Sequence, residues 1–173
     1  ADNNLQDVIS TKVDKDNGIL RISSNENIKS SSSKKVILTV KSLNGIETTS
    51  GAYVMVENTL KVEELDLEST SGSHINADVL TEKLICQTTS GAGIRVSGET
   101  NNLRAESTSG SYIRANELEA QITRVSATSG ANISVNTSKE LTAKATSGAS
   151  IKYSGNPERV DKNNSVSGSI RKN

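Results

Sequence analysis

Apolar and polar residues alternate along most of this chain, and the tripeptide Thr-Ser-Gly interrupts the alternation at regular intervals. A degenerate seventh copy, Val-Ser-Gly, ends at Gly168. The intervals between successive copies are 21, 19, 19, 20, 18 and 20 residues. Alternation with a period of two predicts strands with one buried face, and recurrence at a fixed interval predicts a repeat architecture. The six full copies end at Gly51, Gly72, Gly91, Gly110, Gly130 and Gly148.

Aligning the copies on their glycines shows which positions face the core. The position after the glycine is small, the third is aliphatic and the fifth is mostly apolar. The residues seven and five before the glycine, such as Leu84 and Cys86, continue this inward phase. The same phase places the residues one and three before the glycine inside. We therefore expect the serine of each Thr-Ser-Gly to join a buried ladder of hydroxyl groups that satisfy one another.

The length of one repeat indicates how the strands are arranged. About 19 residues at about 3.3 Å each give a path of about 63 Å, which is too long for one strand and suits one coil of a tube. Stacked coils would lie about 4.8 Å apart, so that Ile94 and Ile113 become vertical neighbours. The prediction is an all-β, single-stranded parallel β-helix with coils of about 20 residues. A β-propeller with two repeats per blade is the alternative, but the aromatic residues typical of blades are missing.

Residues 1–46 do not carry the repeat. Thr11–Val13 and Ile19–Ile22 flank Asp16-Asn17-Gly18, a strong hairpin signal. Val36–Val40 predicts a further strand. We expect this region to cap one end of the repeats in residues 47–173, within the same domain.

Composition narrows the classes of function. Twenty basic and twenty acidic residues give a net charge of zero, so nothing indicates nucleic acid as a partner. No apolar run is long enough to span a membrane, and no signal peptide is visible at the first residues. Cys86 is the only cysteine and replaces an inward aliphatic residue, so we expect a buried, inert thiol.

The recurring Ser-Gly followed by a small residue and Ile, after an N-terminal region that ends in Val36–Val40, resembles the head GIN domain family of adhesins from Bacteroidetes-type bacteria. The resemblance implies a right-handed β-helix of unestablished function with no catalytic residues. It also implies export to the periplasm or outer surface of a Gram-negative cell, with a lipid anchor in some precursors. The resemblance covers most of the chain.

Outward positions provide the candidate sites. Tyr53, His74 and Tyr112 share one outward column, in which aromatic rings could stack on sugars, and Arg95 and Arg114 share another. Packing between neighbouring coils is the alternative explanation for the aromatic column. Acidic residues four before the glycine, Glu68 and Glu106 among them, would stand two coils apart, about 10 Å. His74 has no companion ligand for a metal.

These patterns predict a non-catalytic, exported β-helix with a role in adhesion or envelope structure. A polysaccharide-binding or polysaccharide-degrading protein is the alternative, and ice binding through the Thr column of the repeats is a third hypothesis. We expect no cofactor and no metal. The expected partners are a glycan or an envelope protein, and a second copy of the chain that joins through the open ends of the helix.

Overall fold

The computed structural model describes residues 8–26, 35–165 and 167–173 and divides into two compact units, residues 1–41 and 42–173. The first unit contains an antiparallel hairpin of β1 (Ile9–Asp14) and β2 (Ile19–Ser24). The hairpin prediction is confirmed, although only Gly18 has a positive φ, 67°. Asp14 closes the loop instead, because its carboxylate accepts bonds from the Asn17 side chain at 2.8 Å and from two backbone amides.

The predicted strand at Val36–Val40 is wrong. These residues are irregular and exposed, Ile37 by 74%. An apolar alternation becomes a strand only where a neighbouring strand pairs with its backbone, and none does so within the described residues.

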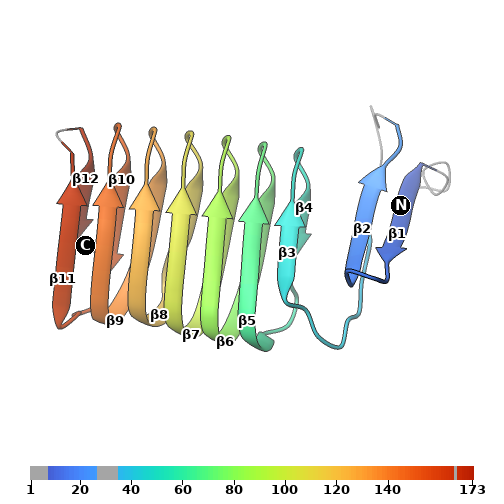
Figure 1. The fold of residues 1–173 in the computed structure, drawn as a ribbon, viewed down its shortest axis with the longest axis horizontal. Helices are drawn as coiled ribbons and strands as arrows, with labels where there is room; N and C mark the ends of the chain where they lie inside the picture. The colour runs from blue at the N-terminus through green and yellow to red at the C-terminus, as the bar shows by residue number, and fades with distance from the viewer. Residues whose placement is uncertain (1–7, 27–34, 166) are drawn as a thin grey trace. The chain divides into compact units, whose positions relative to one another are not determined.

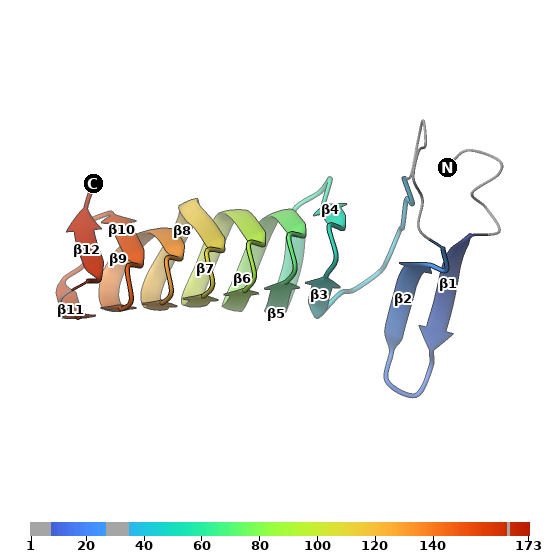
Figure 2. The same ribbon diagram turned by 90° about the horizontal axis from the view of Figure 1, so that it is seen from above.

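The second unit is a solenoid of about seven coils built from one continuous parallel sheet (Figures 1 and 2). Each long strand pairs with its equivalent in the coils before and after it, so the predicted parallel β-helix is confirmed. The described part of the chain contains no helix, hence none that could cross a membrane. The strands are β3 (Gly45–Thr48), β4 (Tyr53–Met55), β5 (Leu60–Ser69), β6 (His74–Thr88), β7 (Gly93–Ser107), β8 (Tyr112–Ala127), β9 (Asn132–Ala145), β10 (Ser150–Ser154), β11 (Arg159–Asn164) and β12 (Ser169–Lys172).

The register follows the sequence alignment through the centre of the solenoid. Ile94 pairs with Ile75 on one side and with Ile113 on the other, and all three side chains are at most 1% exposed. The ladder continues through Ile133 and Ile151. Because vertical neighbours one repeat apart are in contact inside the sheet, the propeller alternative is excluded.

Each Thr-Ser-Gly forms the same tight corner. In the corner of β7 and β8, Ser109 and Gly110 both have left-handed backbones, with φ of 55° and 69°. The amide of Ser111 donates to the Thr108 carbonyl at 3.3 Å and closes a turn of the I′ type. Successive corners also join, since the Gly110 amide donates to the Ser129 carbonyl at 3.0 Å.

The corner geometry overturns the expectation of a buried ladder formed by the Thr-Ser-Gly serines. All six of them are exposed, because two consecutive left-handed residues break the strand alternation and project outward. The position three before the glycine is buried as expected. In two corners, the serine at this position forms a hydrogen bond with the serine directly after the glycine. The sequence alignment identified the position after the glycine only as small.

Six of the buried hydroxyl groups form two closed triads that span two coils, and four others form the pairs Thr81–Thr100 and Thr123–Thr137. Thr88 Oγ1 donates to Ser107 Oγ at 2.8 Å, Ser107 and Ser111 share a bond of 2.8 Å, and Ser111 Oγ donates back to Thr88 Oγ1 at 3.0 Å. Thr48, Ser69 and Ser73 repeat the arrangement. Each triad satisfies its own polar atoms inside a thin core.

The last corner differs from the others. Ser169 pairs with Ser150, so Gly168 stands one position later than the other corner glycines, and its amide donates to Ser165. The seventh copy is thus out of step by one residue with the sequence alignment. Glycine is required at position 168 because a Cβ there would lie 2.1 Å from the Ala145 carbonyl oxygen.

Candidate ligand-binding faces of the solenoid

Two outward rows of side chains flank the corners, and their charges have opposite signs. We call the residues four before each corner glycine the acidic row and those four after it the basic row. The acidic row consists of Glu47, Glu68, Gln87, Glu106, Ser126 and Lys144. The basic row consists of Met55, Asn76, Arg95, Arg114, Ser134, Lys152 and, by pairing of β10 with β12, Arg171.

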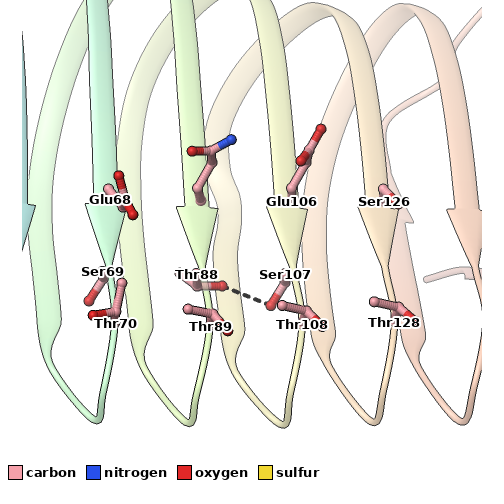
Figure 3. A pocket seen from close by; sticks show the side chains of 11 residues that line it. Glu68, Ser69, Thr70, Thr88, Thr89, Glu106, Ser107, Thr108, Ser126 and Thr128 are labelled. Atoms are coloured by element: carbon pink, nitrogen blue, oxygen red, sulfur yellow. Dashed lines mark hydrogen bonds between the residues drawn. The ribbon is translucent and has the colours of Figure 1, made fainter. Parts of the chain in front are cut away.

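The acidic row borders a shallow groove of about 390 Å³ beside the corner threonines (Figure 3). Glu68 and Glu106 stand in line there, separated by Gln87, as the sequence predicts. Glu106 is already paired, since both Nε and Nη2 of Arg104 donate to its Oε1 at 2.9 and 2.7 Å. The groove therefore presents carboxylate and hydroxyl oxygens, with one carboxylate neutralised by its own strand.

From Asn76 to Arg171 the basic row is an uninterrupted line of cationic and hydrogen-bonding side chains. Arg95 and Arg114 are exposed and lie directly opposite each other on β7 and β8. Neither forms an ion pair with a described residue. Two like charges directly opposite each other on paired strands repel, which makes this pair an unfavourable arrangement unless an anion joins it.

Tyr112 connects the aromatic column to the basic row. Gly93 lies opposite Tyr112, and a Cβ at Gly93 would come within 2.3 Å of Tyr112 Cζ, so the ring rests on the glycine. The centroids of the Tyr112 and His74 rings lie 5.8 Å apart. The guanidinium carbon of Arg114 lies 4.9 Å from the centroid of the Tyr112 ring. Tyr53, which pairs with His74, remains 60% exposed. Contacts between coils thus account for Tyr112 and His74, and Tyr53 is left facing solvent.

A bulge in β8 shapes the surface next to the arginines. Ala115 pairs with Val135 and Glu119 with the very next residue of β9, so residues 116–118 have no partner in β9, although Glu117 and Leu118 still pair with β7. Leu118 turns back into the core, whereas Asn116 and Glu117 face outward. Together with Arg95 and Arg114 they line a hollow of about 260 Å³. Bulges of this kind commonly redirect side chains at binding sites.

The one cysteine and the possible metal ligands among the described residues do not form a cluster. Cys86 is buried as expected, and burial raises the pKa of its thiol to about 12. Within the described residues no three His, Cys, Asp or Glu side chains could hold one metal ion.

The sequence comparison identifies the family. The model of the family described as "Putative auto-transporter adhesin, head GIN domain" matches residues 1–157. The chain belongs to this family. The resemblance drawn from the repeat is therefore confirmed. No curated protein matches the head GIN chain.

Solved structures show the same fold. A "putative adhesin" from Bacteroides fragilis is 24% identical, with a TM-score of 0.80 over 99% of this chain and 79% of that one. A "putative adhesin" from Parabacteroides distasonis is 17% identical, with a TM-score of 0.76 over 99% of this chain and 81% of that one. A "putative lipid binding protein" from the same species is 22% identical, with a TM-score of 0.71 over 99% and 81%.

The structure brings four of the five candidate ligand-facing residues into one connected patch: His74, Tyr112, Arg114 and Arg95. Sequence reasoning missed Lys152 and Arg171 as members of the same row. Lys152 stands at the same offset from its glycine as the two arginines, so the signal was present. Arg171 was hidden by the one-residue offset at Gly168.

Proposed function

We propose that this head GIN domain is a non-catalytic, exported binding protein of the cell envelope, which engages its partner along the outer faces of the solenoid. The supporting observation is the straight register of the outward rows, which repeats polar side chains at the strand spacing of about 4.8 Å over several coils. Such a surface suits an elongated ligand better than a compact substrate. Membership of an adhesin family adds to this support.

The test is a binding screen with the intact, folded chain. We expect a glycan array, or cross-linking to envelope proteins in cells of the source bacterium, to return a partner that is lost when outward residues are changed. Cell fractionation with an antibody should place the protein in the envelope. A chain recovered from the cytoplasm, or one that binds nothing in either screen, would contradict the proposal.

A polysaccharide-degrading enzyme is the second candidate, and the groove of the acidic row favours it. Glu68 and Glu106 are two coils apart, about 10 Å, close to the separation of the paired carboxyl groups in inverting glycosidases. The ion pair between Arg104 and Glu106 argues against a free acid or base. Release of reducing ends from acidic polysaccharides, abolished by Glu68→Gln, would support this candidate over the first.

We also propose that copies associate end to end. At each end of the solenoid the last strands have one strand partner among the described residues, which leaves backbone groups available for pairing. The ends also differ in charge: residues 42–69 carry six acidic and one basic residue, and residues 141–173 carry six basic and two acidic residues. Sedimentation should show self-association at low ionic strength that salt reverses, and a monomer at every salt concentration would contradict it.

A further inference from the structure

Four cationic side chains occupy the basic row, and no carboxylate interrupts it from Asn76 to Arg171. Pairing places the members one coil apart in the order Asn76, Arg95, Arg114, Ser134, Lys152 and Arg171. At about 4.8 Å per coil, the line from Arg95 to Arg171 is about 19 Å long. It is a single line of positive charges and hydrogen-bond donors on a chain whose net charge is zero.

The charges of this row lack the internal partners found elsewhere on the solenoid. Lys83 meets Glu64 of the neighbouring coil at 3.3 Å, and Arg104 meets Glu106 at 2.7 Å. No described carboxylate forms an ion pair with Arg95, Arg114 or Lys152. Lys83 and Arg104 are thus neutralised by neighbouring carboxylates, whereas Arg95, Arg114 and Lys152 are not.

The centre of the row is held in place before any ligand arrives. Gly93 provides the space in which Tyr112 lies, and the ring of Tyr112 supports the Arg114 guanidinium. Gly93 has no positive φ, so its backbone conformation does not require glycine. Glycine is required there because any Cβ would clash with the Tyr112 ring. The bulge at residues 116–118 opens the hollow beside both arginines. Immobilising a cation in this way lowers the entropy lost on binding.

We propose that the basic row binds a linear acidic polysaccharide that lies along the solenoid axis, with its carboxylate or sulfate groups on Arg95, Arg114, Lys152 and Arg171. This inference rests on the proposed binding function and specifies its ligand. The coil spacing is close to the length of one pyranose unit, so one sugar can face each coil. Asn76, one coil before Arg95, and Ser134, between Arg114 and Lys152, provide hydrogen bonds to sugar hydroxyl groups. Arginine forks bind planar carboxylates with two bonds.

A polymer fits this row better than an anionic membrane does. The row is one side chain wide and is bordered by two acids: Glu117 in the hollow, and Asp78, which accepts a bond from Ser97 at 2.9 Å. A flat anionic surface would meet these carboxylates together with the cations. A narrow chain can follow the cations and avoid the acids.

The test measures binding of the intact chain to polygalacturonate, to its methyl ester and to anionic phospholipid vesicles. The wild type should bind polygalacturonate, with affinity that falls as salt rises, and should bind the uncharged ester far more weakly. The double variant Arg95→Gln with Arg114→Gln should lose roughly 10- to 100-fold in affinity, because it removes charge-assisted hydrogen bonds. Dextran sulfate against dextran repeats the comparison for sulfate groups.

The matched control is Arg104→Gln with Arg124→Gln. These two arginines also lie opposite each other on β7 and β8, on the other side of the corner, so the variant has the same net charge as the first. It should change affinity by less than roughly twofold, since long-range charge effects on exposed sites are small in salt. Thermal unfolding of both variants verifies that they fold alike.

Several outcomes would overturn the proposal. Equal losses in the two double variants would show unspecific attraction, and binding to vesicles without binding to either acidic polymer would identify a membrane surface as the ligand. Failure to bind any acidic polymer, while an array or cross-linking screen still returns a partner, would refute this ligand and leave the proposed binding function intact.

Oligogalacturonates of increasing length provide an independent check. Because four coil steps separate Arg95 from Arg171, affinity should rise with length up to about five units and then level off. Lys152→Gln with Arg171→Gln should remove the gain from the longer chains and leave the binding of dimers unchanged. Affinity that does not depend on length would contradict binding along the axis.

Discussion

Each Thr-Ser-Gly corner contains a non-glycine residue in a conformation that suits glycine, and this can be tested at Ser109 and Gly110. Both residues have left-handed backbones, both are exposed, and a Cβ at Gly110 would touch nothing within 4 Å. Substitutions here change backbone strain and almost nothing else. We therefore predict opposite effects at two adjacent positions: Gly110→Ala destabilises the solenoid, and Ser109→Gly and Ser109→Asn stabilise it.

The magnitudes follow from two opposing terms. A side chain in the left-handed region costs about 1–2 kcal/mol. Replacing glycine restricts the unfolded chain and returns about 0.4–1 kcal/mol. Gly110→Ala should therefore lower the free energy of unfolding by about 1 kcal/mol, and Ser109→Gly should raise it by about the same amount. Ser109→Asn should raise it by about 0.5–1 kcal/mol, because asparagine tolerates this region without the entropy of glycine.

The assay is urea unfolding followed by far-ultraviolet circular dichroism, with Ser126→Gly as the control. Ser126 lies in β8 and has no positive φ, so the same substitution there should cost about 0.5–1 kcal/mol. Shifts of Ser109→Gly and Ser126→Gly in the same direction would refute the account of the corner. A neutral Gly110→Ala would refute it as well.

Three further predictions concern the core and the aromatic contact. Ile113→Ala, which empties a 1% exposed position between the isoleucines of neighbouring coils, should cost about 2–5 kcal/mol in urea unfolding, and a cost below about 1 kcal/mol would contradict the ladder. Cys86 should react with a thiol reagent at pH 8 only in urea, and prompt reaction of the native thiol would contradict its burial. Because the pKa of this thiol is about 12 in the folded protein against an ordinary 9, the free energy of unfolding should fall as pH rises above about 9. Gly93→Ala should displace the Tyr112 ring and change the near-ultraviolet circular dichroism, and an unchanged spectrum would contradict the contact.

The core of the solenoid could be predicted from the sequence because one signal determines it. Period-two alternation identifies the inward face, and the interval between glycines identifies which residues stack, as Ile94 and Ile113 do. Both signals are local or strictly repeated, so neither needs a three-dimensional search. Val36–Val40 lacks such a repeat, and there the apolar alternation alone gave a wrong strand.

The corners could not be derived in detail, because alternation was extended through residues that leave the strand. Thr-Ser-Gly-small is a four-residue turn, and treating its serine as a strand residue placed Ser109 inside when it is exposed. Two adjacent left-handed residues are typical of Asn-Gly, and serine gives a weaker signal for them. The triad of Thr88, Ser107 and Ser111 joins two coils, so a single aligned copy does not reveal it.

For the candidate site, the rows could be predicted from the sequence, but the contacts between their side chains could not. Arg95 and Arg114 could be placed side by side from their offset alone. The position of Tyr112 could not, because its ring crosses to the neighbouring coil and depends on the missing side chain of Gly93. In the sequence, Gly93 interrupts the column of aromatic residues. In the structure, the ring of Tyr112 packs against Gly93.

The bulge beside the arginines follows from the unequal lengths of the coils. The interval that begins at Gly110 has 20 residues, between intervals of 19 and 18. Corners and core ladders are locked in register on both sides, so β8 accommodates its surplus residues as a bulge against β9, at residues 116–118. Because stacking fixes the positions of the corners and the core, a change in coil length can open a hollow on an outer face of such a solenoid. Here the hollow lies next to Arg95 and Arg114, the two adjacent arginines of the basic row.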